Sequence, residues 1–384
     1  MYLFSTLGGF ILKKVILVLC VTLALCALAS CGAGTREYDV LDYRTTMEYY
    51  EGFKIMQIAD LHFGIENDLR SQMSVVEKSV LEADPDLIIL TGDNLMYGNK
   101  AIANELFGLL NSLCKRLTEA DENGRLTKFA VTYGNHDNQG DYPRYYLNNT
   151  IKSYVAEDGK EKAEGKFAAF VDYEDDNLFG LTNYYIDLVD DRTKDRDTVD
   201  VKYRIHIIDS NTYHYTGIKY GYDTIHAEQL LHAKKIYNEA TADKDYVGMM
   251  FFHIPFEEFG EAEEQYILAT DPSKIGQGEL REPVSDPYEN NGSFKALREA
   301  NIVSYFVGHD HVNSCDIIYN KGEAFENMAI FSYGVKSTDQ VYHDKDMLGY
   351  KTVTLKDLTP KEFVTIENIN DCFENVRTGA EKYE

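Results

Sequence analysis

Short apolar runs recur along the chain, and each is followed by a polar segment. Runs of this length that end at turn residues are typical of buried β-strands. The clearest ones are 55–59, 87–90, 129–131, 247–252 and 302–307.

Helical spacing appears between several of these runs. Ser71 to Ala83 places Met73, Val76 and Val80 on one face, and the pattern stops before Pro85, as is typical of a helix end. Strands that alternate with helices of this length indicate βαβ units, so the pattern predicts an α/β fold. Further helices are expected at 102–117, 224–240 and 291–300.

The remaining pattern sets the expected domain limits. We expect one catalytic domain over 51–370, a linker over 31–50 and a polar tail over 371–384. The acidic segment 256–291 lacks strong periodicity, so it is predicted to be a surface excursion and a candidate lid near His253. Additional strands are expected at 166–171, 183–188, 201–209, 315–319, 329–333, 350–355 and 362–366.

The first thirty residues have the pattern of a secretory signal. Lys13 and Lys14 precede the apolar stretch 15–29, which is shorter than the roughly 20 residues that span a membrane. The end of this stretch, Leu-Ala-Ser-Cys, resembles the lipobox of bacterial lipoproteins. That resemblance implies lipid attachment at Cys31 and an extracytoplasmic protein anchored to the bacterial cell membrane. An uncleaved anchor is the alternative, because residues 3–12 are also apolar.

Charge and cysteine content exclude some functions. The net charge of −26 disfavours nucleic acid as a partner, because binding to phosphate backbones depends on Lys and Arg. After the signal and Cys31, three cysteines remain without a CxxC spacing, which is typical of neither a zinc–thiolate site nor a disulfide framework. One disulfide among Cys114, Cys315 and Cys372 stays open.

Side chains that bind metals follow the five clearest apolar runs. Five of the ten histidines fall in these places. Because ligands of open α/β sheets gather beyond the carboxyl ends of the strands, the pattern predicts one polynuclear metal site. The segments are Asp60-Leu-His62, Gly92-Asp93-Asn94, Gly134 to Asp137, His253 and Gly308 to His311.

The spacing within these segments suits metal binding. Asp60 and His62 lie two residues apart, as do His309 and His311, so each pair can project from the same side of an extended backbone. Asp93 follows a glycine in a turn, where its two oxygens can bridge two cations. Nitrogen and oxygen ligands without thiolate suit Mn, Fe or Zn.

The five segments occur in the order D-x-H, G-D, G-N-H-D/E, a lone H, and G-H-x-H. In this the chain resembles the calcineurin-like metallophosphoesterases. The resemblance implies a four-layer sandwich, in which two mixed β-sheets are flanked by helices and two divalent metal ions lie at one edge. It implies that Asp60, His62 and His311 hold one ion, that Asn135, His253 and His309 hold the other, and that Asp93 bridges them.

The same resemblance implies the chemistry. His136 matches the catalytic histidine of the family and Asp137 the carboxylate that orients it. The implied reaction is in-line attack on a phosphate ester, small or part of a larger phosphorylated substrate, by a hydroxide that bridges the metals. Asn135 would contribute a neutral carbonyl oxygen.

Finer features resemble the plant and fungal phosphatases allied to the purple acid phosphatases. They include Asp209-Ser210-Asn211 and the segment 251–255. Purple acid phosphatases place a metal-binding Tyr three residues after the bridging Asp, but Met96 occupies that position here, so a divalent metal pair is expected. Phosphomonoester hydrolysis is favoured, with a phosphodiesterase or a catalytically silent metal-binding surface lipoprotein as alternatives.

The other histidines have simpler explanations. His206 and His232 are expected to be structural or at the surface. His214, His226 and His343 lie in or near polar loops, and one of them is a candidate for lining the substrate cleft.

Overall fold

The computed structural model describes residues 39–65, 69–172, 178–194, 199–215, 217 and 220–378. The predicted signal and Cys31 lie outside the described residues. The chain divides into two compact units, Met1–Asp42 and Tyr43–Glu384. Every described β-strand and α-helix belongs to the second unit, whereas the short 3₁₀ helix Val40–Tyr43 lies at the limit between the units.

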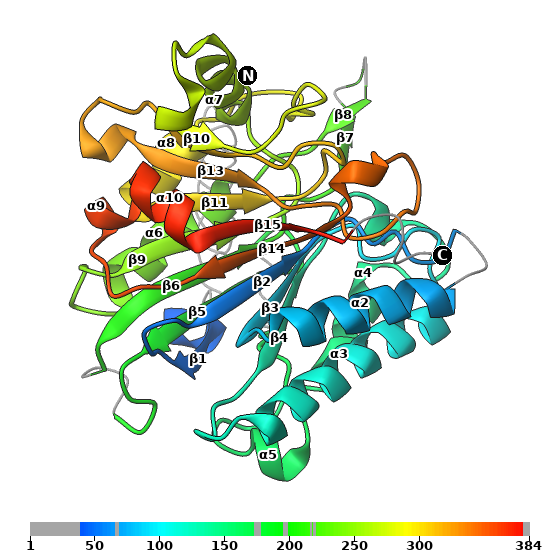
Figure 1. The fold of residues 1–384 in the computed structure, drawn as a ribbon. Helices are drawn as coiled ribbons and strands as arrows, with labels where there is room; N and C mark the ends of the chain where they lie inside the picture. The colour runs from blue at the N-terminus through cyan, green and yellow to red at the C-terminus, as the bar shows by residue number, and fades with distance from the viewer. Residues whose placement is uncertain are drawn as a thin grey trace, which may run out of the picture. The chain divides into compact units, whose positions relative to one another are not determined.

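A five-stranded sheet carries the first ligand segments (Figure 1). Three neighbouring strands at one end of the sheet are parallel, and two antiparallel strands extend it on the other side. Two long helices, α2 (Leu69–Ala83) and α3 (Lys100–Ala120), connect the parallel strands and cover the outer face. The order is β15 (Phe373–Arg377), β14 (Gly349–Thr354), β2 (Lys54–Ile58), β3 (Leu87–Thr91), β4 (Lys128–Thr132).

An eight-stranded sheet carries the remaining ligands. Helices α6 (Ala227–Glu239), α7 (Glu258–Leu268) and α8 (Ser293–Glu299) supply apolar residues to a core cluster on its outer face. The strand order is β1 (Arg44–Glu48), β5 (Asn183–Val189), β6 (Val201–Ile208), β9 (Val247–Phe251), β11 (Ile302–Val307), β13 (Ala329–Tyr333), β12 (Asp316–Tyr319), β10 (Gly276–Gln277).

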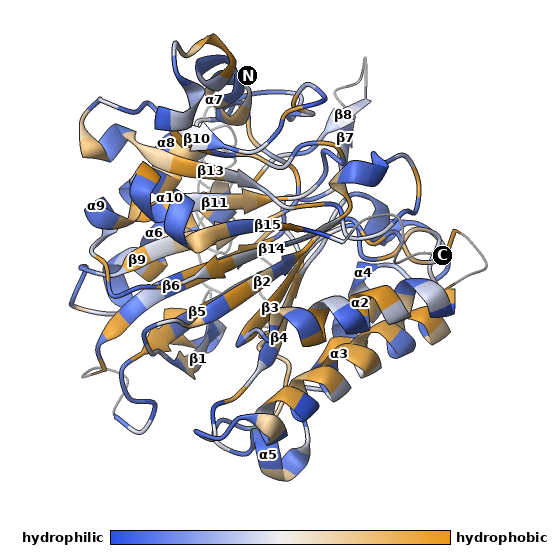
Figure 2. Cartoon of the chain, viewed as in Figure 1, coloured by the Kyte–Doolittle hydropathy of each residue, from blue (hydrophilic) through white to orange (hydrophobic). Residues whose placement is uncertain are grey.

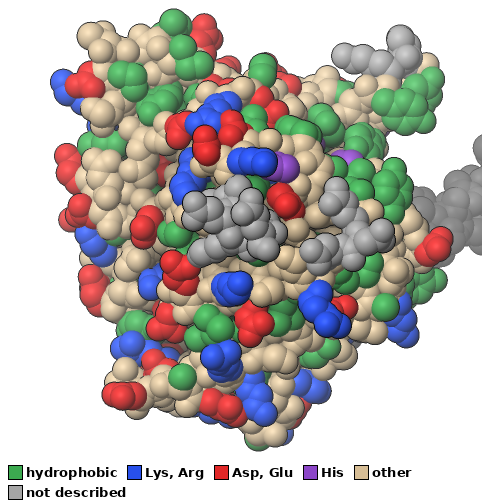
Figure 3. Space-filling view, turned by 45° about the vertical axis from the view of Figure 1, so that its right-hand side comes forward, with side chains coloured by type: hydrophobic (Ala, Val, Ile, Leu, Met, Phe, Trp, Pro, Cys, Tyr) green, Lys and Arg blue, Asp and Glu red, His purple; other side chains and the backbone are tan. Residues whose placement is uncertain are grey.

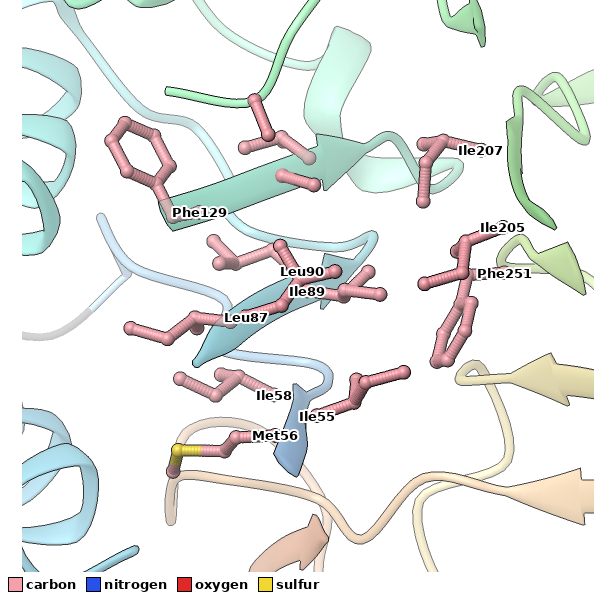
Figure 4. Close-up of a cluster of buried hydrophobic side chains, with 14 of the residues drawn as sticks. Ile55, Met56, Ile58, Leu87, Ile89, Leu90, Phe129, Ile205, Ile207 and Phe251 are labelled. Carbon is pink, nitrogen blue, oxygen red and sulfur yellow. The ribbon is translucent and has the colours of Figure 1, made fainter. Parts of the chain in front are cut away.

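The main core lies between the two sheets. In Figure 4, Ile55 of β2 points toward Ile205 and Phe251 of the large sheet, whereas Met56 points to the opposite side. This alternation follows from the two-residue period of a strand. Hydrophobic residues concentrate in the strands and on the inner sides of the helices (Figure 2). The predicted sandwich of two mixed sheets flanked by helices is therefore confirmed.

Edge strands account for two errors in the expected limits. Residues 44–48 were expected in a linker but form β1, which pairs with β5. Residues 373–377 were expected in a polar tail but form β15, which pairs with β14. Both strands lie at sheet edges and expose one side, so their sequences are too polar to stand out as apolar runs.

Three other expected elements differ in the structure. The segment 362–366 is not a strand, because it spans the end of α9 (Pro360–Phe363), a bend and the first residue of α10 (Ile366–Cys372). Thr359 and Glu362 form a capping box at the start of α9. The segment 256–291 contains α7, which buries Phe259 and Ala262, so it is not an irregular excursion. Residues 166–171 form only a single bridge, between Ala168 and Phe129.

Cys114, Cys315 and Cys372 are buried free thiols. No helix within the described ranges is long and apolar enough to span a membrane.

A buried ion pair joins the two sheets. Lys351 of β14 contacts Asp316 of β12, and both side chains are fully buried. Lys351→Met should lower the free energy of unfolding by about 3–5 kcal/mol, because Asp316 would keep a buried charge without its partner. Urea denaturation measures this loss. The control Lys356→Met removes only the exposed pair with Asp371 and should leave the free energy of unfolding nearly unchanged; equal losses would contradict the account.

Candidate metal centre

The ligand residues occupy strained backbone positions directly beyond the strand ends. Four of them have positive φ angles: 57° at Asp60, 51° at His62, 49° at Asp93 and 76° at His309. L-residues rarely adopt this left-handed region, and each such residue costs on the order of 1–3 kcal/mol. The surrounding fold must therefore stabilise these turns, and they aim side chains that a continuing strand would point elsewhere.

Gly134 lies so close to two predicted ligands that no side chain would fit at this position. A Cβ at Gly134 would lie 2.2 Å from Asp93 Oδ1 and 2.6 Å from His253 Nε2. No side chain fits there, so the turn after β4 can pass beside two ligands only as glycine.

The structure brings the predicted ligands of both sheets together. They form two groups that share Asp93, and none of the seven predicted ligands is more than 7% exposed. Asn135 joins the second group, since its Oδ1 lies 3.2 Å from His253 Nε2. The groups are Asp60, His62, Asp93 and His311, and Asp93, His253 and His309.

Asp93 lies between the two groups. Its Oδ2 is 3.5 Å from His62 Nε2 and 3.3 Å from His253 Nε2. Its Oδ1 accepts a hydrogen bond of 2.8 Å from the backbone N–H of His136. This carboxylate is therefore placed where it can serve both groups.

The donor set fits metal ions. His253 Nδ1 lies 2.8 Å from Thr91 O, and His311 Nδ1 lies 2.9 Å from Tyr342 O. A carbonyl oxygen can only accept, so each Nδ1 carries a proton, and once Nε2 is deprotonated its lone pair points inward. His62 Nε2 faces His311 Nε2 at 3.0 Å. Imidazole nitrogens and carboxylate oxygens that converge in a buried space are a donor set that suits metal cations.

The pKa shifts of the buried Asp and His side chains also indicate a site that attracts positive charge. Burial alone would raise the pKa of Asp60, but His311 and His62 hold it well below its ordinary value. Burial alone would lower the pKa of His253, yet the nearby Asp93 raises it to about 9. The site thus retains a proton that a metal ion would displace, and metal binding releases protons in this way.

His136 is partly exposed beside Asp93, whereas Asp137 is buried. His136 Nε2 lies 4.0 Å from Asp93 Oδ2, and its side chain is 23% exposed. Its Nδ1 lies 3.0 Å from Gln139 Oε1. Asp137 is buried and accepts hydrogen bonds from the N–H groups of Gly134 and Leu95 and from the amide of Asn94.

The expected role of Asp137 is therefore wrong in its detail. Its hydrogen bonds hold the turns after β3 and β4 together, and the side chain that contacts the His136 ring is Gln139. The last two residues of the motif form a 3₁₀ turn with Asn138, His136–Asn138, which turns the neighbouring side chains in different directions.

Sequence reasoning missed several residues around the ligands. Lys336 is buried, and its Nζ donates to the backbone oxygen of Asp60 at 2.8 Å. Burial lowers the pKa of Lys336 to about 8. The ring of Tyr222 meets His309 edge-on at 4.3 Å, and the ring of Tyr342 stacks on His311 at 4.2 Å. No metal-ligand motif marks these residues, since Lys336 and Tyr342 come from loops and Tyr222 ends the short strand β8 (Tyr220–Tyr222).

Other candidates are structural. His206 is fully buried, as expected for a structural residue. His226 caps α6 and stacks on Phe179. Asp209, part of the phosphatase-like segment, binds Arg144 through both carboxylate oxygens, at 2.7 and 2.8 Å.

Comparison with known proteins agrees with this geometry. The model of the calcineurin-like phosphoesterase family matches residues 53–313, which contain every predicted ligand. The chain belongs to the calcineurin-like phosphoesterase family. Its ligands are those of a metal-dependent hydrolase.

The individual relatives share less than a third of their aligned residues with this chain. Phosphatase DCR2 of Saccharomyces cerevisiae is 28% identical over 73% of this chain and 47% of its own length. Probable inactive purple acid phosphatase 29 of Arabidopsis thaliana is 26% identical over 68% of this chain and 67% of its own length. The chain thus spans about half of the yeast relative. A dimetal phosphatase from Danio rerio covers 80% of this chain and 93% of its own, with 12% identity and a TM-score of 0.45.

The number of bound metal ions tests whether Asp93 serves both ion sites. The purified chain saturated with Mn²⁺ should hold about two ions. Asp93→Asn should hold fewer than one, because the replaced group serves both ions and loses its charge. Elemental analysis after removal of free metal measures this. Asp310→Asn is the control: Asp310 is a buried neighbour of two ligands, and its Oδ2 faces the Ser285 N–H. Two ions in Asp93→Asn would refute the shared role.

Proposed function

We propose that this chain hydrolyses phosphate esters, with monoesters favoured, at a site that holds two divalent metal ions. Mn, Fe and Zn suit its ligands. The observation that carries the proposal is the convergence of buried acceptor atoms from both sheets around Asp93. When bound, the ions would supply positive charge to the phosphoryl group and lower the pKa of a coordinated water.

The chain's own residues supply the ligands and a proton. Asp60, His62 and His311 would hold one ion, and Asn135, His253 and His309 the other, with Asp93 between them.

His136 is the residue placed to move a proton. It lies beside Asp93 on the open side of the ligand groups and is partly exposed, whereas the ligands are buried. Its Nδ1 is held by Gln139, so its Nε2 is available to a substrate. As an imidazolium, the ring would donate a proton to the leaving alkoxide or stabilise charge on the phosphoryl group.

The name of the yeast relative favours a monoester substrate, whereas the name of the plant relative fits the catalytically silent alternative. The yeast relative is named a phosphatase, and the plant relative a probable inactive purple acid phosphatase. A phosphodiesterase with the same ligands is the alternative. A silent metal-binding protein is the other alternative, but the position of His136 beside the ligands supports catalysis.

Comparison of two esters tests the proposal. With Mn²⁺, the purified chain should hydrolyse para-nitrophenyl phosphate faster than bis(para-nitrophenyl) phosphate. A reversed preference would identify a phosphodiesterase. If neither ester is hydrolysed with Mn²⁺, Fe²⁺, Zn²⁺ or Co²⁺, the silent alternative gains support.

His136→Ala should keep its metal ions and lose about 10²–10⁴-fold in kcat, because general acid catalysis contributes factors of this size. Gln139→Ala should lose less, since the ring would remain but would be less well oriented. Steady-state kinetics and elemental analysis of the same samples measure both effects. An unchanged kcat in His136→Ala would exclude its assigned role.

We also propose that the chain is exported and lipid-anchored through Cys31. The support is the sequence Leu-Ala-Ser-Cys after the apolar stretch 15–29. Cys31→Ala should move the protein from the membrane fraction to the soluble fraction of the producing bacterium. Retention in the membrane would indicate an uncleaved anchor instead.

A further inference from the structure

A tyrosine hydroxyl contacts a predicted metal ligand from the open side. Strand β7 (Tyr213–Tyr215) pairs with β8 (Tyr220–Tyr222) in a hairpin beside the ligand groups. The hydroxyl of Tyr213 accepts a hydrogen bond of 2.7 Å from Asn135 Nδ2. Figure 3 shows histidine side chains that reach the surface close to hydrophobic ones on this side of the molecule.

This contact sets the orientation of the Asn135 amide. An asparagine amide presents an oxygen on one side and an NH₂ group on the other, and only the oxygen can bind a cation. Asn135 Nδ2 donates to Tyr213, while Oδ1 lies 3.2 Å from His253 Nε2. The Tyr213 hydroxyl therefore lies on the NH₂ side of the Asn135 amide, while the amide oxygen faces His253.

The same geometry leaves the hydroxyl proton of Tyr213 available. Its oxygen accepts from Asn135, and among the described residues no acceptor is found for its own O–H. The side chain is 43% exposed, whereas Asn135 is 2% exposed. A donor at the border between the buried ligands and solvent can reach an anion bound at the site.

The hairpin holds the tyrosine ring in place. Tyr213 stacks on Tyr222 with ring centroids 5.6 Å apart, and Tyr222 meets the ring of His309 at 4.3 Å. The backbone of Tyr222 accepts a hydrogen bond from the N–H of Tyr288. These contacts place the hydroxyl before any substrate arrives, so little reorganisation is needed.

We propose that Tyr213 is a further catalytic residue, whose hydroxyl donates a hydrogen bond to a phosphoryl oxygen while it holds the Asn135 amide. The role rests on the proposed phosphoesterase function. The buried Lys336 already donates a hydrogen bond to the backbone oxygen of Asp60. A neutral donor would thus supplement the ions and His136 in binding the phosphoryl group.

Tyr213→Phe tests the role, because it removes only the hydroxyl. The matched control is Tyr215→Phe in the same strand, since the Tyr215 hydroxyl donates to the backbone oxygen of Gly217 at 3.0 Å. Calorimetric titration with Mn²⁺ comes first and reports on the Asn135 amide. Titration of the Mn²⁺-saturated proteins with inorganic phosphate follows, and kcat and KM for para-nitrophenyl phosphate complete the series.

The expected result for Tyr213→Phe is at least tenfold weaker phosphate binding and a kcat lower by about 10²-fold, as for loss of one donor to developing charge. Tyr215→Phe should match the parent protein. Phosphate affinity and kcat both within twofold of the parent would overturn the proposal. Weaker Mn²⁺ binding with unchanged phosphate affinity at saturating Mn²⁺ would also overturn it, because the hydroxyl would then act only through Asn135.

The two proposals can fail separately. If the parent protein hydrolyses no ester but its phosphate binding depends on Tyr213, the phosphoesterase function fails and the contact with phosphate stands. If the parent is active and Tyr213→Phe equals it in every measurement, the function stands and the role of Tyr213 fails.

Discussion

Mutual repulsion among buried acceptor atoms is the constraint on which the site depends. Inward-facing nitrogens of His62, His253 and His311 meet the carboxylates of Asp60 and Asp93, and all five side chains are buried. Assembling them without a cation would be costly. Their strained turns persist because hydrogen bonds beneath them, from Lys336 and to Thr91, fix the surrounding backbone.

The sandwich supplies those hydrogen bonds by placing the carboxyl ends of strands from the two sheets side by side. His253 follows β9 of the large sheet, yet its ring binds the carbonyl of Thr91 at the end of β3 in the small sheet. The N–H of His309 likewise reaches the carboxylate of Asp60 across the same border. The buried pair of Lys351 and Asp316 joins the sheets elsewhere. The metal centre is thus part of the interface between the sheets.

Much of this could be predicted from the sequence, for physical reasons. Buried strands such as β3 and β9 read as apolar runs, and Asp60, Asp93 and His253 follow such runs directly. Edge strands escaped prediction because most of their residues are only partly buried and their sequences are too polar to form apolar runs. Tyr213 and Lys336 escaped because their roles arise from contacts between distant loops, which no local pattern encodes. Asp137 was assigned by motif, but a 3₁₀ turn directs it away from the His136 ring.

Anomalous diffraction from crystals of the Mn²⁺-loaded protein would test the central claim most directly. The account predicts two peaks about 3.5–4 Å apart, the separation usual for such centres. One should lie among Asp60, His62 and His311 and the other among Asn135, His253 and His309, with Asp93 between them. A single peak, or two peaks that Asp93 does not join, would contradict it.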